Sequence, residues 1–381
     1  MYTMFEAADL HRLAGVRDEV GLLSLYTTVE PGSAVGQTRM RSTLAALRRD
    51  LDTHRDEAWA SAALTRLDQL DEQLDDLLDP TRPGAGRMLF ARLTGDEVDT
   101  RWLQLPVGEV AVVEANAYLW PLLSAIEPAA PAGVARAGRD GVRIFDCRYG
   151  QATELDAVAF NLAGAEWSRE GQASVPTLSR AGIHPDRFPQ RVEEHLTRYL
   201  REAAPTVADN ARRLGWHTLV LVGDPRLTRT LAEALPAGPD VTELDAVLDP
   251  DLTPPEVLDF VRPTLDAART RRELAAVRRV RDLAGSGGTG VLGLADTVSM
   301  LQAGRVEHLL LDASGGWTDS DAVDAGAPPT AALLAGEGTA SELAEGMVEA
   351  ALAHGGAVTL LDPTASAELA DNDRIAAVPR W

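Results

Sequence analysis

The chain has 381 residues, of which 45% are hydrophobic and 25% charged, a composition typical of folded globular proteins and not of disordered ones. This length exceeds what one compact core usually contains, so two or three domains are expected. Asp and Glu number 58 against 36 basic residues, and the net charge is -22. Such a balance argues against sequence-independent binding to nucleic acid, and DNA is not an expected partner. It leaves open the binding of a shaped RNA surface through a local patch.

All 36 Lys-or-Arg positions are arginine, and the absence of lysine excludes several kinds of active site. Without lysine the chain can form neither a Schiff base nor a Walker-type phosphate site. The single cysteine, Cys147, excludes an intramolecular disulfide and a cysteine zinc site. The seven histidines show no metal-ligand spacing, so we expect no metal and no cofactor. No signal peptide and no 18-residue apolar run is present, which predicts a cytoplasmic protein without a membrane partner.

The first segment, residues 1–128, combines strands with an acidic helical stretch. A strand is predicted over Val20–Val29, before Pro31 and Gly32. Leucines at helical spacing then predict a long helix from about Val35 to Leu78, whose acidic run faces solvent. Shorter strands are expected at Leu89–Leu93 and Ala111–Val113. We interpret this segment as a divergent N-terminal domain with a long acidic helix.

The second segment, residues 129–247, reads as a sheet followed by alternating helices and strands. Two or three strands are predicted between residues 133 and 160, before a polar stretch that contains glycine. A helix over Arg187–Leu214, the buried strand HTLVLVGD and a helix over Arg226–Leu235 follow. Between residues 129 and 240, 14 arginines balance 14 acidic residues.

The third segment, residues 248–381, alternates helices with short apolar strands. It begins with an arginine-rich helix that ends near Ala284 and that Pro263 is expected to interrupt. The later elements are predicted at Leu292–Gly304, Val306–Asp312, Ser341–His354, Ala357–Leu361, Pro363–Ala370 and Ile375–Val378. This alternation predicts an α/β/α sandwich. The whole chain is therefore expected to be α/β, or mixed α+β, with three domains.

Three further features have both a structural and a chemical interpretation. The loop GSGGTG, Gly285–Gly290, resembles a phosphate loop, but it lacks lysine and follows a helix, which favours a helix end and a turn. The strand end at Asp224 begins a helix that either binds an anion with Arg226 or is capped by Asp224 itself. Between Arg262 and Asp282, seven arginines accompany three acids. These arginines suit phosphate or carboxylate partners, or form a solvated face.

The order of the elements resembles the bacterial branch of the archaeo-eukaryotic release factor superfamily, which includes the class I release factors of archaea and eukaryotes, Pelota and Balon. The central part of the resemblance consists of YLWPLLSAIE, GVRIFDCRYG, ATELDAVAF, RFPQRVEEHLTRYLREAA and HTLVLVGDPRL. The last segment contributes GLADTVSMLQAGRVEHLLLD and NDRIAAVPRW, and the first contributes LLSLYTTVEPG. The resemblance covers nearly all of the chain and implies a three-domain architecture like that of release factors. Its specificity lies in pattern and order.

In release factors the central domain carries a Gly-Gly-Gln loop that enters the peptidyl-transferase centre. The matching residues here are Glu170, Gly171 and Gln172, in the polar stretch between sheet and helix. The resemblance implies that Gly171 and Gln172 are the candidate catalytic residues, since a glutamine main-chain amide there stabilises charge as water attacks the ester. Glu170 departs from the pattern, because a side chain disfavours positive φ and its carboxylate is repelled by RNA phosphates. The codon-reading motif has no counterpart in this sequence.

The resemblance implies a factor that binds the A site of idle or stalled ribosomes, in hibernation or in rescue. Its partners would then be ribosomal RNA and the tRNA site, with a translational GTPase meeting the third domain. The candidate RNA-binding residues are Arg169, Arg187, Arg271, Arg272, Arg278 and Arg279. Two alternatives stay open from the sequence: a peptidyl-tRNA hydrolase that acts through the degenerate loop, and an interaction scaffold that does not bind the ribosome.

Overall fold

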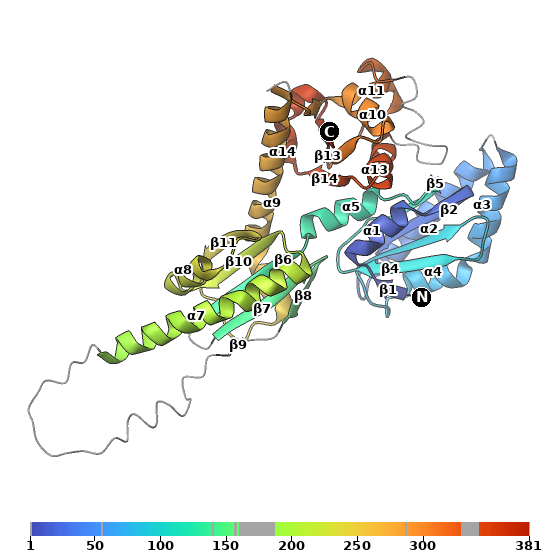
Figure 1. The fold of residues 1–381 in the computed structure, drawn as a ribbon. Coiled ribbons are helices and arrows are strands. Elements are labelled where there is room, and N and C mark those ends of the chain that lie inside the picture. The colour runs from blue at the N-terminus through green and yellow to red at the C-terminus, as the bar shows by residue number, and fades with distance from the viewer. Residues whose placement is uncertain are drawn as a thin grey trace, which may run out of the picture. The chain divides into compact units, whose positions relative to one another are not determined.

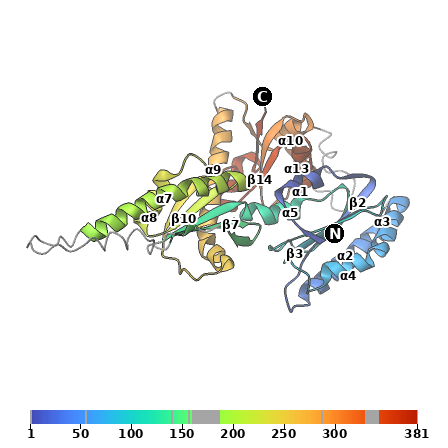
Figure 2. The ribbon, with the colours of Figure 1, turned by 60° about the horizontal axis from the view of Figure 1, so that its bottom comes forward.

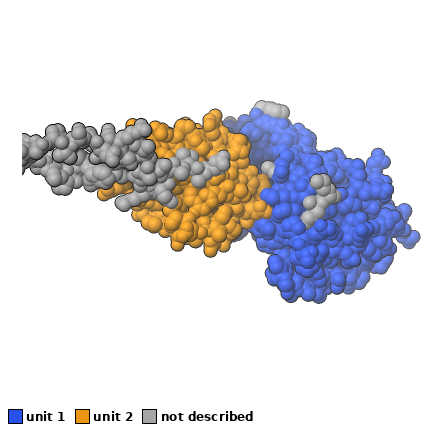
Figure 3. Space-filling view, turned by 90° about the horizontal axis from the view of Figure 1, so that it is seen from below, with its two compact units in different colours: residues 1–128, 269–381 blue, residues 129–268 orange. Residues whose placement is uncertain are grey.

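The computed structural model describes residues 2–54, 56–138, 141–155, 158–159, 187–285, 288–328 and 343–380. The chain divides into two compact units, which Figure 3 colours separately. Unit 1 combines residues 1–128 with residues 269–381, and unit 2 comprises residues 129–268. The α/β class predicted from the sequence is confirmed. The division into three domains, with boundaries after residues 128 and 247, stays a prediction.

The N-terminal part of unit 1 is a five-stranded sheet in the order β1-β4-β3-β2-β5 (Figure 1). Strand β1 runs parallel to β4, and the other neighbouring pairs are antiparallel. Alternate residues of β2, among them Leu23 and Leu25, pack against leucines of three helices that cover one face. The elements of this part are β1 (Tyr2–Met4), α1 (Ala7–Ala14), β2 (Arg17–Thr28), α2 (Val35–Asp52), α3 (Glu57–Gln69), α4 (Asp71–Leu78), β3 (Gly86–Arg92), β4 (Val98–Leu103), β5 (Val110–Asn116), α5 (Trp120–Ile126) and the 3-10 turn η1 (Glu127–Ala129).

The prediction of one long helix over Val35–Leu78 is wrong, because three helices occupy this range (Figure 2). The Asp56 carboxylate accepts the N–H of Trp59 at 2.9 Å and so begins α3, while α4 starts after Leu70. A straight helix over the whole range would be about 65 Å long at 1.5 Å per residue. Five strands span only about 20 Å across the sheet. The two breaks therefore fold one apolar stripe back over the same face.

The C-terminal part of unit 1 is a four-stranded sheet in the order β12-β15-β13-β14, with helices on both faces. Strands β13 and β14 are parallel, and β15 is antiparallel to both of its neighbours. Leu310 and Val378 pack against α9 and α14, whereas α10 and α13 cover the opposite face (Figure 1). The elements are the part of α9 (Pro254–Gly285) that follows Ala268, β12 (Val291–Leu292), α10 (Leu294–Gln302), β13 (Val306–Asp312), α11 (Asp319–Asp324), α13 (Leu343–Ala353), β14 (Ala357–Leu361), α14 (Pro363–Ala367), the 3-10 turn η2 (Ala370–Asn372) and β15 (Ile375–Pro379).

Helix α9 runs through Pro263 without a break, so the interruption expected there is wrong. Proline removes only the hydrogen bond from its own nitrogen to the carbonyl of Asp259. Both residues are exposed, so water can satisfy that carbonyl. The buried residues Val257, Val261 and Ala268 hold the turns on either side in place.

Unit 2 is a sheet in the order β11-β10-β6-β7-β8, with β9 paired to β7. Its alternating side chains form two apolar layers: Leu219 and Leu221 face α7 and α8, and Val220 and Val222 face the first turns of α9. The elements are β6 (Ala132–Gly138), β7 (Gly141–Arg148), β8 (Gln151–Glu154), β9 (Val158–Ala159), α7 (Arg187–Leu214), β10 (Thr218–Gly223), α8 (Pro225–Ala234) and β11 (Asp240–Asp245). Among the described residues, no helix combines the length and the hydrophobicity that a membrane crossing needs.

Candidate functional site

The loop predicted to enter the peptidyl-transferase centre lies outside the described residues. This applies to Arg169, Gly171 and Gln172. Along the chain the loop falls between β9 and α7, which is the sheet-to-helix position expected from the sequence. Arg187 is the first residue of α7. The roles of these residues stay predictions.

The four other predicted RNA-binding arginines lie on the second half of α9, within unit 1. Arg271, Arg278 and Arg279 are exposed, and Arg272 is half-buried. Residues seven apart on a helix lie almost above one another, so 271 with 278 and 272 with 279 form two adjacent rows. In the part of the chain that the structure describes, Arg278 and Arg279 form no ion pair. These two guanidinium groups are therefore available to a partner.

Neighbouring arginines on the same helix serve the fold instead. The Arg269 Nε–H donates to Glu273 at 2.5 Å, and its Nη2 donates to the carbonyl of Leu360 at 3.0 Å. Arg281 forms an ion pair with Glu368 at 3.1 Å. The electrostatics of the helix extend to β13: burial lowers the pKa of His308, and the Arg279 charge lowers it further. The arginine face thus has a structural part and an available part.

Local structure explains the two segments whose sequences resemble phosphate- or anion-binding sites. Asp224 accepts the N–H of Arg226 at 2.9 Å and occupies the start of α8, so the capping interpretation is confirmed. Helix α9 ends at Gly285, and the N–H of Gly288 donates to the carbonyl of Leu283 at 2.9 Å. The glycine-rich loop therefore follows a helix end, as expected.

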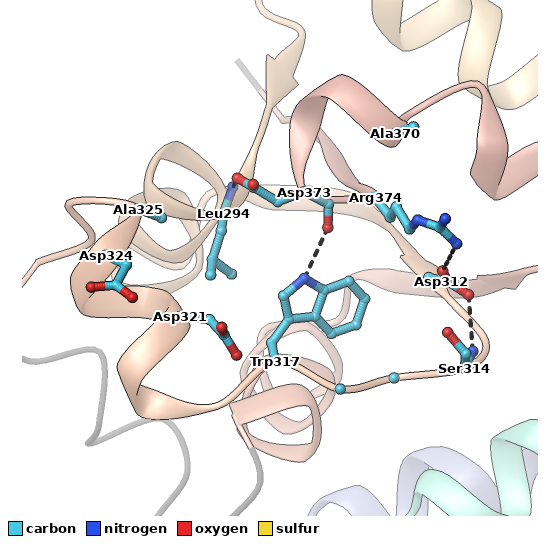
Figure 4. A pocket seen from close by; sticks show the side chains of 12 residues that line it. Leu294, Asp312, Ser314, Trp317, Asp321, Asp324, Ala325, Ala370, Asp373 and Arg374 are labelled. Atoms are coloured by element: carbon cyan, nitrogen blue, oxygen red, sulfur yellow. Dashed lines mark hydrogen bonds and ion pairs between the residues drawn. The ribbon is translucent and has the colours of Figure 1, made fainter.

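A pocket of about 540 Å³ lies at the edge of the C-terminal sheet where β13 ends (Figure 4). The carboxylate of Asp312, the last residue of β13, accepts Arg374 Nη1 and the N–H of Ser314, both at 2.9 Å. The Trp317 indole N–H donates to the carbonyl of Asp373 at 2.9 Å. Asp373 and Arg374 have φ values of 54° and 55°, which side chains disfavour, so this turn is held by its surroundings.

The pocket is acidic. Burial alone would raise the pKa of Asp312, but hydrogen bonds from Ser314 and Arg374 bring it below its usual value. Hydrogen bonds from Thr318 likewise lower the pKa of Asp321. Asp324 and Asp373 add further carboxylates to the lining, beside the single guanidinium of Arg374. Negative charge next to an indole ring suits a cationic group better than a phosphate.

The sequence reasoning missed this pocket, although a signal was present. Asp312 follows a buried apolar strand directly, and Gly315, Gly316 and Trp317 come next. Polar residues after the carboxyl end of a strand in an open α/β sheet commonly line a crevice. Among the described residues, no group of three or more His, Cys, Asp or Glu side chains could hold a metal ion.

Residues 118–251 match the sequence profile of bacterial archaeo-eukaryotic release factor family 10. The resemblance predicted from the sequence is confirmed for this segment, which includes most of unit 2. No curated protein sequence matches the chain.

Solved structures of release factors and Pelota proteins are similar over long stretches at low identity. Archaeal Pelota, from a model of ribosome-bound archaeal Pelota and ABCE1, is 13% identical, over 100% of this chain and 95% of that one, with a TM-score of 0.41. The archaeal translation termination factor aRF1 is 17% identical, over 98% and 97% of the two chains, with a TM-score of 0.25. The termination-like factor Dom34 of S. cerevisiae is 9% identical, over 68% and 67%, with a TM-score of 0.40.

Proposed function

We propose that the protein is a translation factor related to release factors that binds the A site of idle or stalled ribosomes. The family match over residues 118–251 supports this proposal most directly, because the matched segment contains Gly171 and Gln172. Its place of action is then the cytoplasm, in ribosome hibernation or rescue. A translational GTPase is the protein partner that we propose for the C-terminal part of the chain.

An acidic protein needs a local basic surface to approach ribosomal RNA, and α9 offers one. The net charge of -22 repels phosphates over most of the molecule. Arg278 and Arg279 are exposed and form no ion pair within the described residues. Guanidinium groups bind phosphate oxygens through paired N–H donors. In this proposal these arginines contact RNA, while Arg169, Arg187 and Gln172 contact RNA from the central segment.

Co-sedimentation with 70S ribosomes over a salt series tests the proposal. We expect saturable binding of the full chain that weakens steadily with salt, because each phosphate contact releases counterions. Arg278→Ala should weaken binding and reduce the slope of log affinity against log salt by about 1. Arg281→Ala is the matched control, since this arginine lies on the same helix but is paired with Glu368. Its slope should stay closer to that of the parent.

The result that overturns the proposal is equally plain. A protein that stays in the supernatant at low salt, with ribosomes from growing and from starved cells, does not bind the ribosome. If the slope of log affinity against log salt were equal for the parent and Arg278→Ala, Arg278 on α9 would not contact RNA, although the protein would still bind the ribosome.

A further inference from the structure

Helix α13 of the C-terminal part holds the backbone at which the release-factor-like segment begins. The Glu345 side chain is buried, and its carboxylate accepts the N–H groups of Leu119 and Trp120, the latter at 2.8 Å. Helix α5 starts at Trp120, so these N–H groups have no partner within their own helix. A carboxylate from the last part of the chain therefore caps a helix of the first part.

Two more glutamates accompany this contact, of which Glu114 is buried and Glu349 is half-buried. Glu349, one helical turn beyond Glu345, accepts the side-chain N–H of Asn116 at 2.8 Å. Glu114 lies two residues before Asn116 on β5 and is 5% exposed. Its charge acts on both Glu345 and Glu349. Glu114, Glu345 and Glu349, which we call the glutamate joint, thus bring three carboxyl groups together from α13 and β5.

Among the described residues, the charges that act on Glu345 come from other glutamates, whereas Glu349 is affected by both Glu114 and Arg17. From β2, Arg17 acts on Glu349, and the neutral hydroxyl of Tyr26 lies close enough for the Glu345 charge to act on it. Helices α1 and α10 also pack against α13. Their titratable residues are Asp9, His11, Arg12 and Asp296, and Asp9 and Arg12 pair with each other. Glu307 on β13 is exposed.

Proton affinity in the joint follows from this arrangement. Burial raises the pKa of Glu345 well above its ordinary value, although its two backbone donors act in the other direction. Burial also raises the pKa of Glu349 to about 7, and the Glu114 charge adds to this rise. Asn116 and Arg17 lower it only in part. Glu349 therefore exchanges a proton near neutral pH.

We propose that the glutamate joint is a proton-dependent fastening between α13 and the start of the release-factor-like segment. When the joint opens, its carboxyl groups enter water and regain their ordinary, lower proton affinity. The closed form therefore binds protons more tightly, and closure is favoured at acidic pH. As pH rises from the ordinary carboxyl range to about 7, the open form loses the Glu349 proton before the closed form does. The closed form therefore loses stability over this window, and Glu349 adds no further loss above about 7. This inference stands on unit 1 alone and does not depend on ribosome binding.

Hydrogen–deuterium exchange of the full chain tests the joint at the amides that it holds. The measurement follows the peptide containing Leu119 and Trp120 between about pH 5 and 8.5, corrected for the intrinsic exchange rate. The Glu349 proton contributes a fall in protection of up to tenfold per pH unit between about pH 5 and 7, and none above about 7. In Glu349→Gln the side chain keeps an oxygen acceptor for Asn116 and carries no charge. Its protection should lack the Glu349 contribution and fall less steeply below pH 7, and the slope that remains belongs to Glu345.

Glu127→Gln is the matched control. Burial raises the pKa of Glu127 to about 7 as well, but the charges that act on it belong to Arg269, Arg272 and Glu273 on α9. This variant should keep the full pH dependence at Leu119 and Trp120. The readout is the slope of log protection against pH at Leu119 and Trp120. If Glu349 had only a structural role, Glu349→Gln would not change this slope. Constant protection in the parent, or an equally steep fall in Glu349→Gln, overturns the proposal.

Discussion

The two faces of the N-terminal sheet are built from the same strands but are held by different forces. On one face, Leu23 and Leu25 of β2 pack against the leucines of α2, α3 and α4. On the other face, the intervening residues Ser24 and Tyr26 form hydrogen bonds with Tyr118. Glu114, on this second face of β5, belongs to the glutamate joint. The apolar face contributes stability that is independent of pH. The polar face joins the sheet to the C-terminal part through hydrogen bonds and through carboxyl groups that bind protons.

The largest effect is expected from the apolar face. Leu67 of α3 is fully buried in the leucine core, so Leu67→Ala should lower the free energy of unfolding by about 2–5 kcal/mol. Because no titratable group is involved, the loss should be the same at pH 6 and pH 8. Denaturant unfolding at both pH values measures it. A loss that changed with pH would show that the two faces are coupled. Leu64→Ala, at a partly buried position of the same helix, is the control and should cost less.

A second variant disrupts packing at the polar face without changing a titratable group. Gly315 has a φ of 41°, and a Cβ there would lie 2.3 Å from Cζ2 of Trp120. Gly315→Ala should therefore displace Trp120 and cost about 1–3 kcal/mol of unfolding free energy. It should also speed exchange of the Trp120 amide equally at pH 6 and pH 8. An exchange rate like that of the parent would contradict the close packing of these two residues. Gly316→Ala, where a Cβ meets open space, is the matched control.

The apolar face could be predicted from the sequence because its signal is local. The leucines between Leu64 and Leu77 recur at helical spacing, and the Val20–Val29 run marks β2 within a few residues. The breaks between α2, α3 and α4 were missed, because the apolar stripe continues across them. The cap of α8 was found because Asp224 and Arg226 are neighbours in sequence.

The polar face could not be predicted, because its contacts join residues that are far apart in the chain. Glu345 and Leu119 are separated by 226 positions, and within α13 Glu345 resembles any helical glutamate. Burial decides its chemistry, and burial depends on tertiary packing. The roles of Gly171 and Gln172 rest on a family resemblance, since no spacing within the loop distinguishes them. The acidic pocket needed the turn at Asp373 and Arg374, which only the folded chain brings to Asp312.

The smallest expected effect separates hydrogen bonding from protonation on the polar face. The Tyr26 hydroxyl donates to the carbonyl of Tyr118 at 2.5 Å, and burial raises its pKa well above the ordinary value of 10. The hydroxyl therefore stays protonated from pH 6 to pH 8. Tyr26→Phe removes this hydrogen bond and leaves the ring contact with Phe90, so unfolding should become easier by about 1 kcal/mol at either pH. A cost that grew with pH would mean that Tyr26 shares the proton of the glutamate joint. A free-energy cost of Tyr26→Phe that is the same at both pH values, together with pH-dependent exchange in the parent, assigns that proton to the glutamates. The Tyr26–Tyr118 hydrogen bond and the glutamate joint lie on the same face of the sheet, and only the glutamate joint titrates in this range.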